Sequence, residues 1–181
     1  MTPTPTVSVV VPTHGRGEAL AVLVPQLLAD QDLDELVVVV DGHGDPSEAF
    51  LRAAAEQDAR LRPVVQENRG RTLARQRGAD EATGDVVVFL DDDVLPRVPL
   101  AAAHARHHLD RDDLVVVGAM TTSPARWDPR ARLYDKAYSD HVALWQEHPE
   151  RLLEHFWGGH FSMRRATLQR LDGFSPEASY G

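Results

Sequence analysis

Three consecutive aspartates, Asp91, Asp92 and Asp93, follow directly after the apolar run Val86–Leu90. Like charges in adjacent positions repel one another, and this repulsion is costly at the end of a buried strand. A positive group should therefore offset them, and carboxylate oxygens are the ligands that Mg²⁺ and Mn²⁺ prefer in proteins. The cluster predicts a site for a divalent metal. A solvated turn or a helix N-terminus is the alternative, because carboxylates are favourable there as well.

The elements around the aspartates indicate an α/β sheet. Five runs rich in β-branched residues are predicted strands, at Val7–Val11, Leu36–Val40, Arg62–Val65, Val86–Leu90 and Leu114–Val117. Most are apolar throughout, which suits strands that are covered on both faces. Segments of helical character lie between them, at Glu18–Ala29, Ser47–Ala59, Thr72–Ala82 and Pro99–Leu109. This alternation predicts a mostly parallel sheet flanked by helices in a single domain.

Polar residues gather where four of these strands end. They are Pro12–Arg16, Asp41–Asp45, Asn68–Gly70 and Asp91–Asp93. Ligands of an open α/β sheet bind outside the carboxyl ends of its strands, so we expect these segments to share one rim. Asp41-Gly42 alone would be an ordinary turn signal, and its place on this rim makes it a candidate site residue.

The composition excludes several classes of function. A chain of 181 residues with 43% hydrophobic content fits one globular domain, able to bury roughly 70% of its unfolded surface. The net charge of -9 argues against non-specific nucleic-acid binding, which requires a basic face. There is no cysteine for disulfides or thiolate metal sites, and no apolar run approaches the ~20 residues of a membrane span. Because Met1–Thr6 lacks the regions of a signal peptide, we expect a cytoplasmic protein.

The pattern changes after Gly118. Thr121–Pro129 is polar and contains proline, Arg130–Gln146 is a predicted helix, and Leu152–Met163 is predicted to be extended, with an interruption at Gly158-Gly159. On residue types alone, this glycine pair could be only a turn or a bulge.

Three histidines lie within the predicted helix Pro99–Leu109. His104 and His108 have the i, i+4 spacing of helical metal ligands, with His107 beside them. No carboxylate stands at ligand spacing next to them, so we interpret the three histidines as a solvated helix face.

Five segments, in order, resemble the inverting nucleotide-sugar glycosyltransferases of family 2, which have the GT-A fold. They are Val9–Thr13, Val40–Gly42, Asn68–Gly70 with Ala74–Gly78, Phe89–Asp93, and Trp157–Arg165 with the Gly173-Phe174 pair that follows. Gln76 stands where asparagine is common in the family. Each segment is weakly specific alone, and their order over nearly the whole chain carries the resemblance. It implies a GT-A, Rossmann-like α/β fold.

The resemblance implies a role for each residue on the rim. Asp93 would bind Mg²⁺ or Mn²⁺, and Asp91 would face the metal or the ribose. Contacts to the donor nucleotide would come from Pro12, Thr13, Arg16, Asp41, Asn68, Arg75 and Asp92. The acceptor side would include Gly158, Gly159 and His160. A cation is needed because negative charge grows on the diphosphate as the sugar–phosphate bond breaks.

The resemblance also implies the substrates and the extent of the enzyme. The donor would be a nucleotide sugar, and the acceptor a saccharide, a lipid-linked molecule or another hydroxyl compound, in the cytoplasm or at the membrane periphery. Residues 1–120 would form a nucleotide-binding half and residues 121–181 the start of an incomplete acceptor-binding half. Inversion needs a general base, which the family carries in a Glu-Asp pair after Gly-Phe. The chain stops at Gly181 before such a pair, so we expect a fragment whose base lies beyond it, and Glu177 is not assigned.

Two alternatives stay open. Asp91-x-Asp93 after a strand also resembles the nucleophile motif of aspartate-dependent phosphohydrolases. That family needs a later lysine after an apolar strand, and Lys136, the only lysine, has no such strand before it. The other alternative is a truncated module that binds nucleotide without activity.

Overall fold

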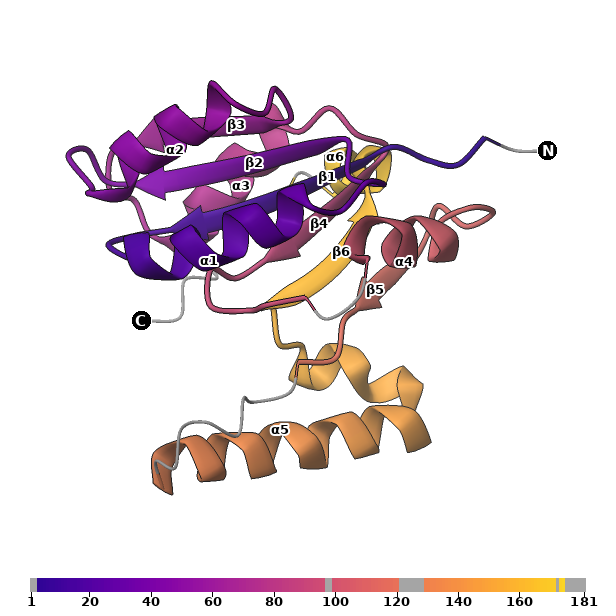
Figure 1. Ribbon diagram of the computed structural model, residues 1–181. Coiled ribbons are helices and arrows are strands. Elements are labelled where there is room, and N and C mark those ends of the chain that lie inside the picture. The colour runs from indigo at the N-terminus through magenta and orange to yellow at the C-terminus, as the bar shows by residue number, and fades with distance from the viewer. Residues whose placement is uncertain (1–2, 97–98, 121–128, 172, 175–181) are drawn as a thin grey trace.

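The computed structural model describes residues 3–96, 99–120, 129–171 and 173–174. Most of the polar stretch Thr121–Pro129, and Glu177 near the end of the chain, lie outside the described residues. A six-stranded sheet stands at the centre of the described chain, with helices packed around it (Figure 1).

The strand order of the sheet is β3-β2-β1-β4-β6-β5. Four neighbouring strands are parallel: β1 (Val7–Thr13), β2 (Glu35–Asp41), β3 (Leu61–Gln66) and β4 (Val86–Leu90). β6 (His160–Arg164) enters between β4 and β5 (Val115–Val117) and runs antiparallel to both. The predicted mostly parallel sheet is confirmed, and it has an antiparallel edge that the strand spacing did not indicate.

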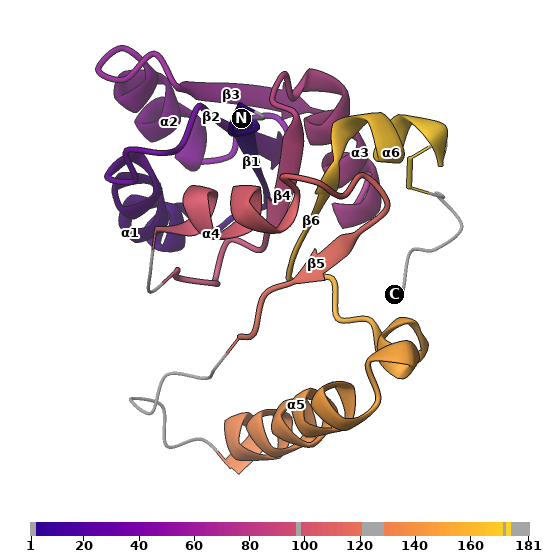
Figure 2. The same cartoon turned by 90° about the vertical axis from the view of Figure 1, so that its right-hand side faces the viewer.

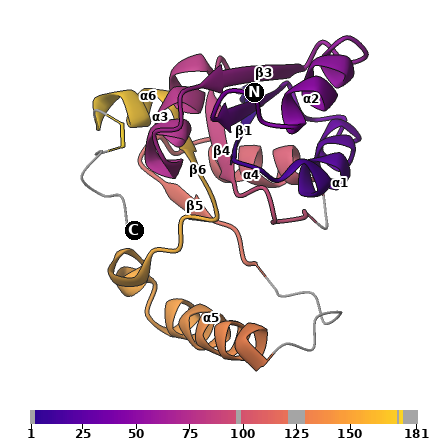
Figure 3. The same ribbon diagram turned by 90° about the vertical axis from the view of Figure 1, so that its left-hand side faces the viewer.

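Helices cover both faces of the sheet (Figures 2 and 3). One face carries α1 (Gly17–Leu28), α2 (Ser47–Ala55) and α4 (Leu100–His107), and the other carries α3 (Arg71–Glu81) and α6 (Arg165–Arg170). Successive valines of β1 belong to opposite cores: Val9 lies on the side of α1, and Val10 on the side of α3. Because both faces are covered, the strands are apolar throughout, as the sequence indicated.

A contact that requires glycine brings α3 close to the sheet. A Cβ atom at Gly78 would lie 2.2 Å from Cγ1 of Val10, a distance that no side chain could occupy. Any larger residue at position 78 would push α3 away from β1. This close approach places the N-terminal end of α3, with its arginines, beside the carboxyl end of β4.

An arm formed by α5 (Pro129–Glu147) and the 3-10 helix η1 (Pro149–His155) projects beyond the β5–β6 edge (Figure 1). The Tyr138 hydroxyl of α5 accepts a hydrogen bond from the Met120 backbone at 2.8 Å, which attaches the arm to the end of β5. The prediction of extended structure from Leu152 was wrong for residues 152–155, because a proline at the first turn starts η1 there. None of the helices in the described part of the chain is long and apolar enough to cross a membrane.

The interpretation of His104, His107 and His108 as a solvated helix face was wrong for two of the three. His107 is exposed, but His104 is only 4% exposed and His108 is fully buried. The reason is the insertion of β6 beside β4, which extends the sheet beneath α4. The buried imidazoles find hydrogen-bond partners on β6, described below.

Candidate active site

Asp91 lies where β4, α3 and the segment before β6 meet. Its backbone N–H donates to the carbonyl of Gly159 at 2.9 Å. Its carboxylate accepts a hydrogen bond from Arg75 Nη2 at 2.5 Å, and Nη1 of Arg71 lies 3.8 Å away. Arg75 also donates to the carbonyl of Gly158 at 2.7 Å. Asp91 and Arg75 therefore connect the parallel strands to the Gly158-Gly159 segment.

The Arg75 side chain is only 13% exposed, so the Asp91 carboxylate is needed to offset the cost of burying its charge. Burial lowers the pKa of the guanidinium, and the negative charge of Asp91 acts in the opposite direction. The Nε atom of Arg75 is buried and has no hydrogen-bond partner among the described residues. Asp91 is the one carboxylate that forms an ion pair with Arg75 among the described residues, and a buried charge is costly to leave unpaired, so Asp91 and Arg75 act as a unit.

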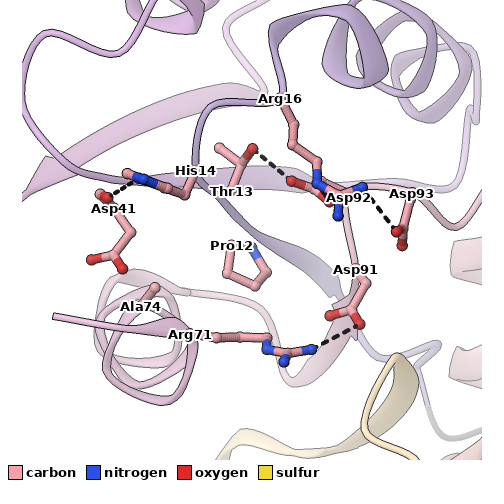
Figure 4. A pocket seen from close by; sticks show the side chains of 10 residues that line it. All are labelled: Pro12, Thr13, His14, Arg16, Asp41, Arg71, Ala74, Asp91, Asp92 and Asp93. Atoms are coloured by element: carbon pink, nitrogen blue, oxygen red, sulfur yellow. Dashed lines mark hydrogen bonds and ion pairs between the residues drawn. The ribbon is translucent and has the colours of Figure 1, made fainter. Parts of the chain in front are cut away.

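Asp92 turns toward β1, away from Asp91 (Figure 4). Its carboxylate accepts a hydrogen bond from Thr13 Oγ1 at 2.7 Å, and the residue is only 9% exposed. Burial raises the pKa of the Asp92 carboxyl, while the Thr13 hydrogen bond and the Arg16 charge lower it. This contact joins the ends of β1 and β4.

Asp93 is the most accessible of the three carboxylates, with a side chain that is 56% exposed. Nη1 of Arg16 lies 3.0 Å from its Oδ2, and Nε of Arg16 lies 3.7 Å from Asp92. Exposed ion pairs of this kind contribute little free energy, commonly ~0–1 kcal/mol. Another cation could therefore replace Arg16 at Asp93 at small cost.

Asp41 is buried at the end of β2 and is only 5% exposed. Its carboxylate accepts hydrogen bonds from Gln66 Nε2 at 2.8 Å and from the backbone N–H groups of Arg69 at 2.9 Å and Gly70 at 2.8 Å. The Nδ1 atom of His14 donates to the Asp41 carbonyl at 2.6 Å. Asp41 thus orders the loop that follows β3 and holds His14 beside it.

These residues line one cavity of about 240 Å³ at the carboxyl ends of the parallel strands (Figure 4). The lining residues are Pro12, Thr13, His14, Arg16, Asp41, Arg71, Ala74, Asp91, Asp92 and Asp93. The structure brings together the ends of β1, β2 and β4 as the sequence predicted. Arg75 adjoins the cavity through Asp91, whereas Asn68 is exposed in the loop after β3 and is not among the lining residues.

Arg71 was missed in the sequence, and His14 and Ala74 lay in predicted segments but were given no role of their own. Arg71 precedes Arg75 by one helical turn, so the i, i+4 spacing on α3 could have identified it. His14 carried no signal beyond its position between Thr13 and a glycine. Of the three residues predicted on the acceptor side, Gly158 and Gly159 contact Arg75 and Asp91 as described. The ring of His160 lies against His104 and is not among the residues that line the cavity.

The chain itself supplies positive charge to the aspartate cluster. Arg16 is paired with Asp93, and Arg75 and Arg71 face Asp91. Among the described residues, no group of three or more histidines, cysteines or acidic residues is arranged to hold a metal ion. The protein could supply one or two carboxylates to a cation, a number typical of Mg²⁺ sites in which substrate phosphates and water complete the coordination.

The sheet order, the covering helices and the carboxylate cavity define a GT-A fold. A mannosyltransferase from Pyrobaculum calidifontis, solved in complex with GDP-Man and Mn²⁺, has the same fold, with a TM-score of 0.70 over 97% of this chain and 23% identity. Residues 8–171 match glycosyl transferase family 2, and the chain belongs to this family. This membership favours sugar transfer over the phosphohydrolase alternative.

Curated relatives are also glycosyltransferases. A glucosyl-dolichyl phosphate glucuronosyltransferase of Haloferax volcanii is 33% identical over 115 residues, which are 62% of this chain and 37% of the relative. An undecaprenyl-phosphate 4-deoxy-4-formamido-L-arabinose transferase of Sodalis glossinidius is 35% identical over 109 residues, which are 54% of this chain and 33% of the relative. The chain thus spans about a third of these relatives and 49% of the mannosyltransferase chain.

Proposed function

We propose that this chain binds the nucleotide-sugar donor in an enzyme that transfers the sugar to an acceptor hydroxyl, with inversion and with a divalent metal. The observation that carries the proposal is the cavity at the carboxyl ends of β1, β2 and β4, which combines three adjacent carboxylates with two arginines. Family membership supports the same reaction class. The Mn²⁺ and GDP-Man of the mannosyltransferase structure support a metal and a nucleotide sugar as ligands.

In this proposal Asp93, with Asp91 beside it, holds Mg²⁺ or Mn²⁺. Asp93 fits because its carboxylate is exposed to the cavity and its only described ion-pair partner, Arg16, is a replaceable surface group. Asp91 is less free, because Arg75 already occupies one of its oxygens. When bound, the metal supplies charge stabilisation to the leaving diphosphate.

The arginines and β1 would bind the rest of the donor nucleotide. Arg16 and Arg71 are exposed cations on the cavity wall, at 54% and 65%, and can turn toward phosphate oxygens. Pro12 and Thr13 would line the base pocket. Asp41 would act on the nucleoside mainly by ordering its loop, since three hydrogen bonds from the chain already reach its carboxylate.

The acceptor would lie next to Gly158 and Gly159, close to Asp91. The acceptor class is a saccharide, a lipid-linked molecule or another hydroxyl compound. The names of two relatives contain a dolichyl phosphate and an undecaprenyl phosphate, which supports a lipid-linked acceptor and a location at the membrane periphery.

Calorimetric titration of the 181-residue chain with UDP, GDP and dTDP, with and without Mn²⁺, tests the proposal. We expect one of the nucleotides to bind, and chelation of the metal to abolish that binding. Replacing residues that merely orient metal ligands typically costs 10–100-fold in metal affinity, so Asp93→Asn should weaken metal-dependent binding by about 100-fold or more.

Asp113→Asn is the matched control for Asp93→Asn. Asp113 forms an ion pair of similar geometry with Arg111, at 2.9 Å, and its side chain is 72% exposed. It is not among the residues that line the cavity. Equal losses in the two variants, or a folded wild-type chain that binds none of the three nucleotides with Mn²⁺, would contradict the proposed function.

A further inference from the structure

Four buried or partly buried polar side chains form a continuous chain of contacts beneath α4, outside the cavity. His104 Nδ1 lies 2.7 Å from Ser162 Oγ, and His108 Nε2 lies 2.9 Å from the same oxygen. His104 Nε2 lies 2.8 Å from His160 Nε2. His104, His108 and Ser162 are 4%, 0% and 0% exposed. These hydrogen bonds join α4, and His108 directly after it, to β6, whereas α1 meets the parallel strands through buried apolar side chains.

The hydrogen-bonding capacity of these groups requires the contacts to act together. A neutral imidazole has one N–H and one acceptor nitrogen, and a serine hydroxyl has one proton to donate. If His104 donates to His160, its other nitrogen must accept from Ser162, and the hydroxyl must then accept from His108. If His160 donates to His104 instead, His104 must donate to Ser162, and the bond between Ser162 and His108 can then run in either direction, because a hydroxyl can accept two hydrogen bonds. Losing His104 or Ser162, which each have two partners in the network, leaves polar atoms of both partners without a hydrogen bond.

The histidines in this chain of contacts are kept neutral. Burial lowers the pKa of His104 to about 3, and contact with neighbouring histidines acts in the same direction. Burial also lowers the pKa of His160 and of His108, where the Arg164 charge adds to the effect. Each neutral imidazole has one donor and one acceptor nitrogen, so these histidines can hold α4 and β6 at fixed positions through their hydrogen bonds.

The network ends beside the active site, at His160. The preceding residue, Gly159, accepts the backbone hydrogen bond of Asp91, and Gly158 accepts from Arg75. The carbonyl of His160 accepts from the Gly118 N–H at 3.0 Å, and its ring packs directly on Gly118, where a Cβ atom would lie 2.0 Å from it. Both the backbone and the side chain of His160 are therefore fixed.

We propose that His104 and Ser162 are positioning residues of the active site, which act through His160 to hold the Gly158-Gly159 segment against Asp91 and Arg75. α4 follows Asp91–Asp93 in the chain, and β6 follows Gly158-Gly159, so one network fixes the two segments that flank the cavity. The consequence for sugar transfer rests on the proposed function. The positioning itself can be measured without any substrate.

Two substitutions of His104 separate positioning from simple stabilisation. A glutamine amide reaches about as far as Nε2 and can keep the bond to His160, whereas an asparagine amide reaches about as far as Nδ1 and can keep only the bond to Ser162. Each variant loses one hydrogen bond of His104, so their global stabilities should be similar. They differ in the bond to His160, which His104→Gln can keep and His104→Asn loses. His107→Gln, on the exposed side of α4, is the control.

Native-state hydrogen exchange, measured by NMR, then shows how firmly the start of β6 is held. The amides of Asp91 and Gly118 donate to Gly159 and His160, so their protection reports on this segment. In His104→Asn we expect both amides to lose at least about tenfold more protection than the amides of β2. In His104→Gln and His107→Gln the difference should stay within about threefold. Equal loss at all amides, or no loss at Asp91 and Gly118, would overturn the proposal.

Ser162→Ala provides a variant that removes a single oxygen, should either His104 variant fail to fold. It removes the hydrogen bonds of Ser162 to both His104 and His108, one more than His104→Gln removes, and it should also lower protection at Asp91 and Gly118 more than in β2. Titration in the presence of Mn²⁺ with whichever of UDP, GDP and dTDP the wild type binds supplies the functional arm: affinity should fall several-fold in His104→Asn and not in His104→Gln. If the wild type binds but His104→Asn binds equally well, the link to the active site is wrong. If the wild type binds no nucleotide, the proposed function fails, and the exchange data still decide the positioning.

Discussion

The parallel strands β1 to β4 and the antiparallel pair β6–β5 belong to one sheet but are stabilised differently. In the parallel part, buried valines on both faces meet apolar residues of α1, α2 and α3, and the contacts are non-directional. Beneath α4, at the antiparallel edge, the buried layer contains three histidines and a serine joined by hydrogen bonds. Apolar packing tolerates small shifts, whereas hydrogen bonds require a fixed geometry. The region that contains the Gly158-Gly159 segment, proposed to lie beside the acceptor, is the one with directional contacts.

Phe89 gives the largest expected effect, because it joins the two regions. It is fully buried on β4, and its ring stacks on Phe161 of β6 at 4.8 Å and meets Phe174 edge-on at 5.0 Å. Phe89→Ala should lower the free energy of unfolding by about 3–5 kcal/mol, measured by urea denaturation. Phe89→Leu, which keeps most of the volume, should cost clearly less. A loss below about 1 kcal/mol for Phe89→Ala would show that the regions are not joined through this ring.

Arg75→Met tests the polar connection between the same regions. It leaves the Asp91 carboxylate, which is 21% exposed, without its close cation, and should cost about 3 kcal/mol in unfolding free energy. Arg71→Met is the control, because Arg71 is 65% exposed and 3.8 Å from the same carboxylate. Its cost should stay below about 1 kcal/mol. Similar losses in the two variants would contradict the distinction between the buried and the exposed arginine.

Acid should weaken the antiparallel edge first. The unfolded chain protonates His104 near its ordinary pKa of 6.5, whereas the folded chain does so only near 3. Between these values the unfolded state binds more protons, so the free energy of unfolding should fall by about 1.4 kcal/mol per pH unit as the pH drops below 6.5. Above pH 6.5 this contribution is constant. His160 and His108, whose pKa values are also lowered, should add to the slope, whereas the opposite charges of Arg164 and Asp112 partly cancel at His108.

His104→Gln isolates this effect, because it removes one titrating group and keeps the contact with His160. Urea denaturation between pH 6.5 and 5 should show a shallower slope for this variant than for the wild type, even if the variant is less stable at pH 8. His107→Gln should keep the wild-type slope. Identical slopes in the wild type and His104→Gln would mean that the folded chain protonates His104 as readily as the unfolded chain does.

The smallest effect is expected on the outer side of the α5 arm. Lys136 and Asp140 form an i, i+4 ion pair at 2.6 Å, and their side chains are 76% and 65% exposed. Asp140→Asn should change the unfolding free energy by only about 0.3–0.5 kcal/mol, and less at high salt. A loss above about 1 kcal/mol would show that this side of α5 packs against another part of the molecule.

Local patterns in the sequence were sufficient for the parallel part of the fold. Runs such as Val86–Leu90 are apolar without alternation. This pattern is typical of strands that are covered on both faces, whatever residues cover them. The carboxyl ends of parallel strands necessarily share one edge, so the meeting of Pro12, Asp41 and Asp91 could be predicted before any contact was known. The family resemblance pointed to the same edge, and family membership is now established over residues 8–171.

Only the tertiary structure decided which partners those residues take. Sequence spacing showed that the aspartates need positive charge, but not that Arg75, Arg71 and Arg16 approach them from α3 and the end of β1. It also could not show that β6 enters between β4 and β5, since this pairing joins residues about 70 positions apart, such as Leu90 and His160. That insertion buries His104 and His108, which have the spacing of an exposed helix face. The i, i+4 pattern is the same for a solvated helix face and for one that packs on polar groups. The difference here is that Ser162 and His160 of β6 lie against this face.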